Sequence, residues 1–251
     1  MSIVVRGCHI GEGRPKVIIP IVETTESKIL ERAFEFSRLR IDCVEWRVDW
    51  FEQCTDAHSV VSCLQKLRVA LKDKLLLVTF RTKVEGGEAS LTHKEYLDFI
   101  NTVIDTDCAD LIDIEFFTAG NDIRELIDNA HSSGDVVVCS SHDFQKTPDK
   151  NELISRMVKM QQVGADLPKV AVMPHDSTDV LTLLAATVEM KNKYFATPIV
   201  TISMGKLGAV WLRHDFCKRW RLKCSRTDGT GCCQRCVRLN SRIKNRWGID
   251  P

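Results

Sequence analysis

Two apolar segments, residues 136–140 (Val-Val-Val-Cys-Ser) and residues 169–173 (Lys-Val-Ala-Val-Met), decide the fold class of this 251-residue chain. Between them, residues 153–163 show the apolar spacing and charged face of an amphipathic helix. A strand, a helix and a second strand in this order form a βαβ unit with parallel strands. Both segments are apolar on both faces, as in a sheet that helices cover. The stretch therefore predicts an α/β protein.

The same unit repeats along most of the chain, and the remaining expected strands are residues 17–22, 43–48, 75–80, 111–116 and 199–203. The remaining expected helices are residues 29–39, 60–71, 96–104, 123–130 and 180–190. One strand per roughly 30 residues favours a TIM (β/α)₈ barrel. An open doubly wound sheet is the alternative. No Gly-x-Gly-x-x-Gly follows the first strand, which weakens the dinucleotide-binding form of that alternative.

Composition indicates an ordinary globular protein, with 44% hydrophobic and 27% charged residues. No apolar run approaches the ~18–20 residues needed to cross a bilayer. The N-terminus has no apolar core long enough for a secretion signal. We therefore expect a cytoplasmic protein without a membrane partner, in which the 11 cysteines are mostly free thiols.

The last part of the chain differs in composition from the rest. Residues 214–251 contain ten basic and three acidic residues and five of the cysteines, although the whole chain carries a formal charge of only +1. They show neither a β-branched run nor helical periodicity. We expect a barrel domain at residues 1–210 and an atypical basic, Cys- and Trp-rich tail at residues 211–251. The eighth strand and the closing helix of a complete barrel would then be lost or altered.

Two functions are conceivable for this tail. Its basic residues could attract nucleic acid through phosphate contacts. Its cysteines could bind zinc, but their spacing, Cys217-x₆-Cys224-x₇-Cys232-Cys233-x₂-Cys236, lacks two well-spaced Cys-x₂-Cys pairs. We expect neither a metal nor a nucleic-acid partner. The mixture of Cys, Arg and Trp is instead typical of translation out of frame, so we hypothesise a frameshift near Val210.

Polar residues follow the predicted strands at their C-terminal ends, where parallel barrels build their active sites. Glu45 and Arg47 are two residues apart and so face the same side of one strand. Arg81, Glu115 and His142 end the next three strands. Charged groups inside a sheet are costly unless they are paired or bind a ligand. An interior ion-pair network and a functional site are therefore both open interpretations.

Lys169 starts an apolar strand, which is unusual for a lysine. Burial and a nearby positive charge would lower the pKa of its amine, freeing it to attack a carbonyl. His142, one strand earlier, would remove a proton from the carbon beside the resulting imine. Glu45 would orient the imidazole, while Arg47 and Arg81 would hold a substrate carboxylate. Each residue alone has a structural explanation, but their shared position favours Schiff-base chemistry.

Residues 15–210 resemble type I 3-dehydroquinate dehydratase. The motifs that carry the resemblance are Glu45-Trp46-Arg47-Val48-Asp49, Thr79-Phe80-Arg81-Thr82 with Glu85-Gly86-Gly87, Ser141-His142-Asp143-Phe144, Pro168-Lys169, Val172-Met173-Pro174 and Ser203-Met204-Gly205. The resemblance implies a homodimeric TIM barrel with no metal or organic cofactor. It also implies a lyase that dehydrates 3-dehydroquinate to 3-dehydroshikimate in the shikimate pathway of aromatic amino-acid biosynthesis.

The resemblance also implies residue roles. Lys169 would form the imine and His142 would act as general base and acid. The segment from Glu45 through Trp46 to Arg47, together with Arg81, would bind substrate.

The resemblance ends at Val210. The family continues with Ser-Arg, but here Trp211 and Leu212 occupy those places and Arg213 lies one place late. Arg213 is therefore the candidate for the family arginine's contact with substrate. If the tail cannot replace what the family supplies after this point, activity would be weak or absent. The alternatives to an active lyase are a catalytically impaired barrel fragment and a nucleic-acid-interacting protein using its basic tail.

Overall fold

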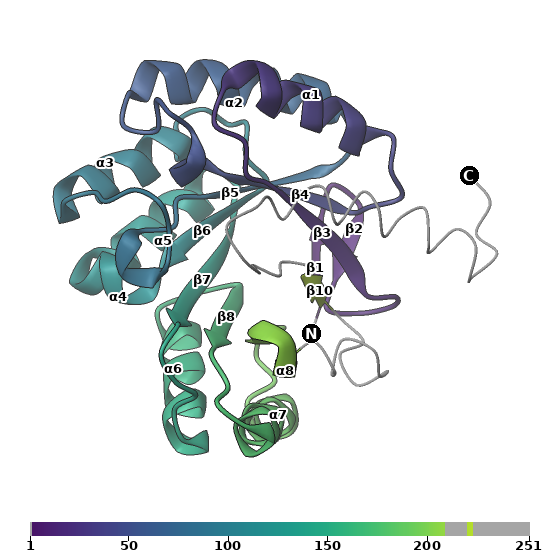
Figure 1. The fold of residues 1–251 in the computed structure, drawn as a ribbon, viewed down its shortest axis with the longest axis vertical. Coiled ribbons are helices and arrows are strands. Elements are labelled where there is room, and N and C mark those ends of the chain that lie inside the picture. Colours follow the sequence, from purple (N-terminus) through teal and green to yellow (C-terminus); the bar gives the residue numbers. More distant parts are fainter. Residues whose placement is uncertain (1, 209–219, 223–251) are drawn as a thin grey trace.

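The computed structural model describes residues 2–208 and the backbone of residues 220–222, and in this part helices surround the outer side of a curled parallel sheet (Figure 1). The strands of the sheet are β3 (Lys16–Ile21), β4 (Cys43–Arg47), β5 (Leu75–Thr79), β6 (Leu111–Glu115), β7 (Val136–Asp143), β8 (Leu167–Val172), β9 (Val200–Ser203) and β10 (Trp220–Leu222). The α-helices are α1 (Glu26–Ser37), α2 (Ala57–Leu71), α3 (His93–Ile104), α4 (Phe116–Ala119), α5 (Ile123–Ser132), α6 (Lys150–Gln162), α7 (Ser177–Lys193) and α8 (Gly205–Gly208). Short 3₁₀ turns are η1 (Val48–Trp50), η2 (Lys83–Glu85) and η3 (Gly120–Asp122).

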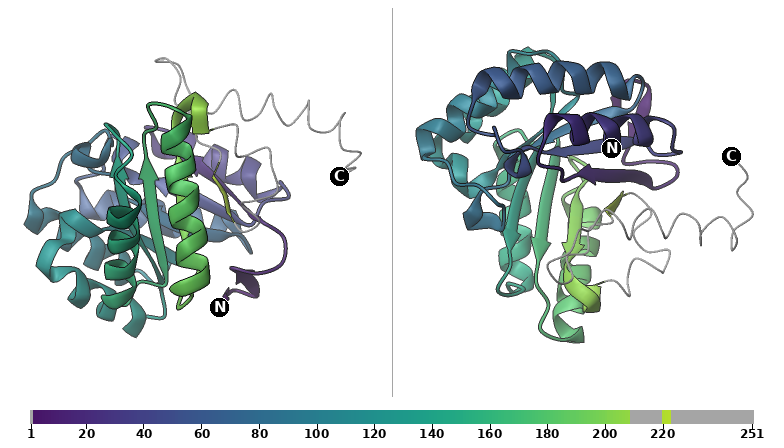
Figure 2. Two further views of the ribbon diagram at one scale, coloured as in Figure 1. Left: turned by 90° about the horizontal axis from the view of Figure 1, so that it is seen from below. Right: turned by 45° about the horizontal axis from the view of Figure 1, so that its top comes forward.

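From β3 to β9, each strand pairs in parallel with the next strand in sequence. Figure 2 shows that the sheet curls and that the helices lie on its convex side. This neighbour order is that of a TIM-type barrel, because each helix returns the chain to the adjacent strand position. The seven predicted strands and the predicted fold class are thus confirmed.

The eighth strand position is altered. Trp220–Leu222 pairs in parallel with β3, with Trp220 opposite Lys16 and Leu222 opposite Ile18. This short strand is not predicted by the sequence pattern. Within residues 2–208 and 220–222, no ladder joins it to β9, so the described sheet does not close into a ring. The expected loss or alteration of the closing helix concerns residues outside the described part and stays a prediction.

Side-chain caps determine where several helices begin, at Asp56 for α2, Thr92 for α3, Asp149 for α6 and Asp176 for α7. Each cap accepts hydrogen bonds from backbone N–H groups of the first helical turn, which have no partner within the helix. The predicted starts of these helices are nearly one turn too late. The reason is that the first turns are polar, whereas apolar periodicity begins only in the second turn.

The sheet separates two apolar layers, because successive side chains of a strand point to opposite faces. The outer face packs against the helices and includes Trp46, Val78, Ile112 and Cys139. The inner face is apolar in the N-terminal half of the barrel, where its side chains are Ile18, Cys43, Leu75, Leu77, Leu111, Val138, Leu167 and Val200. Toward the C-terminal ends of the strands, the inner face becomes polar.

A hairpin that the sequence pattern does not predict packs against the apolar half of the interior. Its strands, β1 (Ile3–Val5) and β2 (Cys8–Ile10), pair antiparallel. Ile10 belongs to the interior cluster, and three further apolar side chains of the hairpin pack against it. Arg6 between the strands pairs with Asp110 just before β6. Strands of three residues are too short for their alternation to be recognised.

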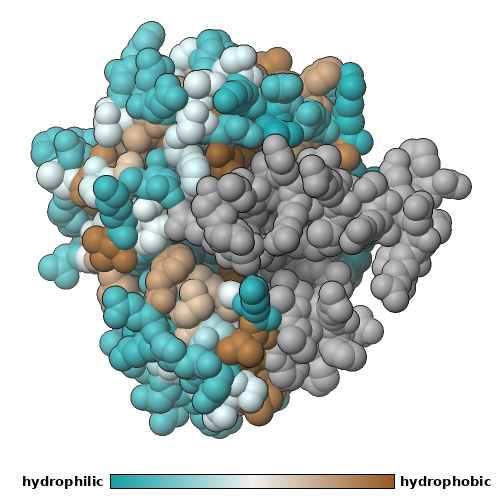
Figure 3. All heavy atoms as spheres, in the orientation of Figure 1, coloured by the Kyte–Doolittle hydropathy of each residue, from teal (hydrophilic) through white to brown (hydrophobic). Residues whose placement is uncertain are grey.

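Hydrophilic residues cover most of the described surface in the view of Figure 3, with hydrophobic residues in scattered patches. Scattered exposed apolar residues are normal for folded proteins. No helix within residues 2–208 is long and apolar enough to cross a membrane. The cysteines of this part, Cys8, Cys43, Cys54, Cys63, Cys108 and Cys139, are free thiols.

The packing of α2 gives the first testable prediction. Leu64 is fully buried on α2, whereas Leu181 on α7 is 53% exposed. Leu64→Ala should lower the free energy of unfolding by about 2–5 kcal/mol, because it removes buried methyl groups and leaves a cavity. Leu181→Ala should lower it by about 0.5 kcal/mol or less. Urea unfolding of both variants measures this, and equal losses would contradict the assigned packing.

Candidate active site

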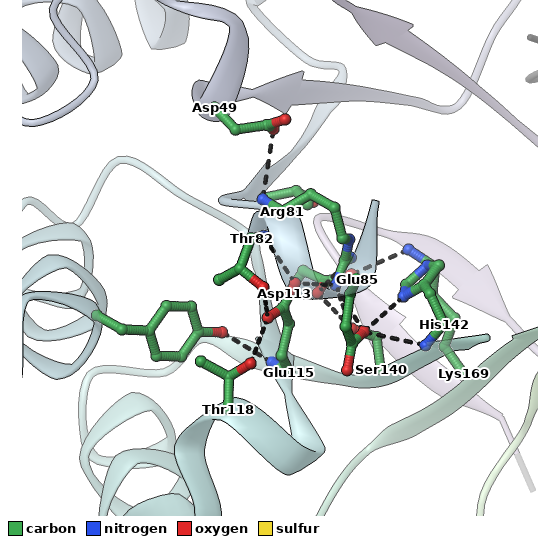
Figure 4. Close-up of polar contacts among 12 residues, drawn as sticks. Asp49, Arg81, Thr82, Glu85, Asp113, Glu115, Thr118, Ser140, His142 and Lys169 are labelled. Carbon is green, nitrogen blue, oxygen red and sulfur yellow. Dashed lines mark hydrogen bonds and ion pairs between the residues drawn. The ribbon is translucent and has the colours of Figure 1, made fainter. Parts of the chain in front are cut away.

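The polar half of the interior contains an unusual number of buried charged groups. Alternation along β4 to β8 directs one polar side chain after another inward, namely Glu45, Thr79, Arg81, Asp113, Glu115, Ser140 and Lys169, all of which are buried. Figure 4 shows that several of them are joined by polar contacts. Because buried charges are stable only when paired and hydrogen-bonded, the partners of each one define what the site can do.

Lys169 lies inside the barrel with only 4% of the residue exposed. Its Nζ is 2.9 Å from Oδ2 of Asp113 and 3.9 Å from Oε1 of Glu45. Sequence reasoning expected a positive charge beside this amine; the charged groups in contact with Nζ within residues 2–208 are these carboxylates, and Arg81 binds the same Asp113 carboxylate. The amine is therefore held in place by anions, away from bulk solvent.

Asp113 connects the amine to the rest of the network. Its carboxylate accepts hydrogen bonds from Lys169, from Arg81 Nη2 at 2.8 Å and from Ser140 Oγ at 2.6 Å. Burial alone would raise the pKa of Asp113, but Arg81 and Lys169 outweigh burial and hold it well below its usual range. Asp113 is therefore a permanent anion beside the lysine amine.

Arg81 is surrounded by carboxylates. Nη1 donates to Oε1 of Glu115 at 2.8 Å and to Ser140 at 3.0 Å, with Oε2 of Glu85 at 3.4 Å, while Nη2 donates to Asp113. Burial opposes the charge, yet the carboxylates raise the pKa of Arg81 further above its ordinary value. In this structure Arg81 serves as counter-ion to interior acids. Its direct contact with a substrate carboxylate stays a prediction.

His142 pairs with Glu85 on the loop after β5. Oε2 of Glu85 lies 2.9 Å from Nδ1 of His142 and also accepts from its backbone N–H at 3.0 Å. The prediction that Glu45 orients this imidazole is wrong, because Glu45 instead accepts from Thr79 Oγ1 at 2.8 Å. Within residues 2–208 no side chain or backbone group is hydrogen-bonded to Nε2, so this nitrogen is available to a ligand.

Burial sets the protonation of this pair. Desolvation, reinforced by Arg81 and Lys169, lowers the pKa of His142 well below its ordinary value. Desolvation also raises the pKa of Glu85 to about 8, although Arg81 opposes the shift. His142 is therefore neutral at physiological pH, as a general base must be, and Glu85 binds a proton near neutrality.

Two glycines shape the loop that carries Glu85. Gly86 has a φ of +82°, a conformation that favours glycine. A Cβ at Gly87 would lie 1.7 Å from the backbone oxygen of Arg81, so no side chain fits there. The Gly87 N–H donates to Thr82 O at 2.8 Å, which keeps the loop folded against the end of β5.

The other predicted substrate-binding residues have different positions. Arg47 is paired with Asp49 through two hydrogen bonds of 2.7 Å, and its side chain is 17% exposed. That Trp46 binds substrate as part of the segment from Glu45 to Arg47 stays a prediction. Trp46 points to the opposite face of β4, where it is fully buried in the helix-facing core beside Phe51. Arg213 lies outside the described residues.

Sequence reasoning overlooked Asp113 and Glu85 as site residues. Asp113 precedes Glu115 by two positions and therefore shares its inward face, so alternation could have identified it. Glu85 lies in the turn η2, where strand periodicity gives no signal. Within residues 2–208, no group of three His, Cys, Asp or Glu side chains is arranged to hold a metal ion.

Together, the fold and this interior define an α/β barrel enzyme with a buried lysine amine and a neutral imidazole on adjacent strands. A family model described as type I 3-dehydroquinase matches residues 17–211. The chain belongs to this family, and so is a type I 3-dehydroquinate dehydratase by family.

Known relatives agree with this membership. The 3-dehydroquinate dehydratase of Bacillus subtilis strain 168 is 47% identical over 206 residues, which are 82% of this chain and 81% of that protein. Among solved structures, the 3-dehydroquinate dehydratase of Enterococcus faecalis has a TM-score of 0.81 at 43% identity and covers 83% of this chain and 87% of its own. The type I enzyme of Clostridium difficile has a TM-score of 0.84 at 40% identity and covers 88% of both chains.

The family match ends at residue 211, next to Val210, where sequence analysis placed the end of the resemblance. The aberrant tail is consistent with this limit. The domain boundary itself and the frameshift hypothesis stay predictions.

The pair of Glu85 and His142 predicts a specific dependence of stability on pH. The pKa of Glu85, about 8 in the folded protein, is above the ordinary value of 4.5. Folding therefore takes up a proton between these values, and that stabilising contribution is lost as pH rises through about 8. In Glu85→Gln the amide cannot titrate. We expect the free energy of unfolding of the wild type to fall relative to this variant between pH 4.5 and 8.

Urea unfolding at a series of pH values measures the difference. Glu31→Gln, at an exposed carboxyl on α1, is the control for the loss of one acidic group. Parallel pH curves for the wild type and Glu85→Gln would contradict the raised pKa.

Proposed function

We propose that this chain dehydrates 3-dehydroquinate to 3-dehydroshikimate through an imine on Lys169, in the shikimate pathway. Family membership supports the reaction. The observation that carries the residue assignment is the buried Lys169 amine, hydrogen-bonded to Asp113 and one strand away from His142. Lys169 is registered with Ser140 on β7, and His142 lies two residues further along the same face. Both side chains therefore serve one interior site.

The first step joins the substrate ketone to the lysine. The Lys169 ammonium gives up a proton as its nitrogen attacks the carbonyl carbon, and two of its three protons leave with the carbonyl oxygen as water, so that a protonated imine remains. Asp113 favours this cation because it stays ionised and lies 2.9 Å from the same nitrogen. Arg81 and Ser140 continue to pair with Asp113 while the lysine reacts. The C. difficile relative is described with covalently modified comenic acid, which supports covalent chemistry in the family.

The second step removes a proton from the carbon next to the imine, which the imine has made acidic. His142 Nε2 accepts that proton, since Nδ1 is bonded to Glu85. The resulting imidazolium then protonates the departing hydroxyl, which leaves as water. Hydrolysis of the imine releases product and restores Lys169. His142 thus acts first as base and then as acid.

Substrate positioning involves the partly exposed Arg47. Its Nε and Nη2 are paired with Asp49, whereas Nη1 has no hydrogen bond within residues 2–208. This free edge suits a substrate hydroxyl or carboxylate oxygen. Glu45, 3.9 Å from the lysine amine, would accept from a substrate hydroxyl. Correct placement of the reacting atoms supplies several kcal/mol of the barrier reduction, by estimates for oriented reactions.

The remaining proposals are a homodimer in the cytoplasm without an organic cofactor or metal. We expect the altered tail to impair turnover more than it impairs imine formation. The imine needs only residues of β6 to β8, whereas the complete reaction needs substrate contacts that the family supplies after residue 211. Nothing in residues 2–208 favours nucleic-acid binding over this reaction.

Borohydride trapping tests the lysine. Incubation with 3-dehydroquinate and borohydride should reduce the imine to a stable secondary amine on Lys169, detected by peptide mass spectrometry. Lys169→Ala should abolish the adduct. Lys16→Ala is the matched control, because Lys16 is also a buried lysine of the sheet but lies at the other end of the barrel. An adduct on any other lysine would show that the assignment is wrong.

Replacement of His142 separates the two steps. His142→Ala should still form the adduct, because Lys169 and Asp113 remain, but turnover should fall by about 10²–10⁴-fold without the general base. His131→Ala removes a histidine on α5 that pairs with Asp166 and should leave turnover unchanged. Steady-state assay of product formation and the trapping yield are measured on the same samples. Retained turnover in His142→Ala would refute the role of the imidazole.

A further inference from the structure

Asp49 is a buried acid of the site that the reaction steps do not use. It lies in η1, directly after β4, and its side chain is fully buried. The chain leaves strand geometry at Arg47 and turns, so Asp49 does not continue the alternation of β4. Its carboxylate instead folds back toward the guanidinium of Arg47.

Both oxygens of Asp49 are fully used. Oδ1 accepts from Arg47 Nε at 2.7 Å and from the backbone N–H of Arg81 at 3.3 Å. Oδ2 accepts from Arg47 Nη2 at 2.7 Å and from the backbone N–H of Glu88 at 3.1 Å. All four partners are donors, so the arrangement requires an ionised carboxylate. A protonated carboxyl group in this place would leave at least one of these four donors without an acceptor.

The two contacts to Arg47 fix the plane of its guanidinium. A bidentate pair of this kind restricts both position and orientation. Asp49 is fully buried while Arg47 is partly exposed, so the pair anchors the inner edge of the guanidinium. The Nη1 edge is left for a ligand. An arginine without this anchor would sample many rotamers.

The two backbone contacts hold a loop. Arg81 and Glu88 stand at the two ends of the segment that contains η2 and Glu85. Between them, Glu85 contacts Nδ1 of His142 at 2.9 Å. The Asp49 carboxylate therefore binds the backbone at both ends of this loop and also orients Arg47.

We propose that Asp49 is a positioning residue for the dehydration, which couples the substrate-binding edge of Arg47 to the loop that orients His142. The inference rests on the proposed function, because it assigns Asp49 a place in that reaction. It predicts that one substitution at Asp49 weakens substrate binding and proton transfer together, although Asp49 touches neither the substrate nor the imidazole.

Asp49→Asn tests the coupling. Asparagine keeps the shape but replaces one acceptor oxygen by an NH₂ group, which opposes an N–H donor of Arg47 and the backbone N–H of either Arg81 or Glu88. We expect kcat/KM to fall about 10- to 100-fold, the loss typical of a charged hydrogen bond. KM should rise because Arg47 is released, and kcat should fall because the loop carrying Glu85 loosens. Arg47→Ala alone should mainly raise KM.

Asp110→Asn is the matched control. Asp110 is also a buried carboxylate that accepts from two arginines, Arg6 and Arg68, and from the backbone N–H of Leu76. It lies at the opposite end of the barrel. Its substitution should destabilise the protein comparably but leave KM, kcat and the pH profile unchanged. If Asp49→Asn behaves like Asp110→Asn in the kinetic assays, Asp49 is merely structural and the proposal is overturned.

A second readout does not require turnover. In ¹⁵N NMR spectra of the folded protein, Asp49→Asn should shift the Nε signal of Arg47 and the ring nitrogen signals of His142, whereas Asp110→Asn should shift neither. Unchanged signals in Asp49→Asn would overturn the coupling. Absence of a trapped adduct in the wild type would instead contradict the proposed function, so the two failures are distinguishable.

Discussion

The ion pair between Lys169 and Asp113 is the constraint on which the rest of the interior depends. A lysine at the centre of a barrel is costly unless an anion and further hydrogen bonds compensate its charge. Asp113 provides the anion at 2.9 Å, and Arg81 and Ser140 keep Asp113 charged in turn. The chain thus buries the Lys169 amine while Asp113 stays ionised. In the proposed mechanism, the same carboxylate would stabilise an iminium ion formed on Lys169.

The fold makes this arrangement possible by dividing the interior into two halves. Apolar side chains and the N-terminal hairpin occupy one half, so within residues 2–208 they cover the N-terminal side of the polar half. Strand alternation then directs the charged side chains of successive strands to one level. The loop containing Gly87 adds Glu85, which strand geometry alone could not supply. The packing of the core and the placement of the interior charges therefore both follow from the alternation of side chains along the parallel strands.

The sequence pattern was sufficient for the fold from β3 to β9, because apolar runs and helical periodicity are local signals. It also predicted that Lys169 and His142 lie on adjacent strands of one interior, since polar residues at strand ends stand out against apolar neighbours. The sequence pattern failed where contacts between residues far apart in the chain determine the partner of a side chain. Their shared position at strand ends suggested Glu45 as partner of the imidazole, but the folded loop brings Glu85 there. For Trp46, alternation along β4 correctly implies a side chain that faces the helices. The short hairpin and β10 had no readable pattern at all.

The most direct test is a crystal structure of the protein reduced with borohydride in the presence of 3-dehydroquinate. The account predicts continuous density from Nζ of Lys169 to a ligand carbon, with Asp113 still in hydrogen-bond contact with that nitrogen and Nε2 of His142 within reach of the neighbouring carbon. Density for a ligand bound to another residue, or a ligand on Lys169 whose reacting carbon is out of reach of His142, would contradict it.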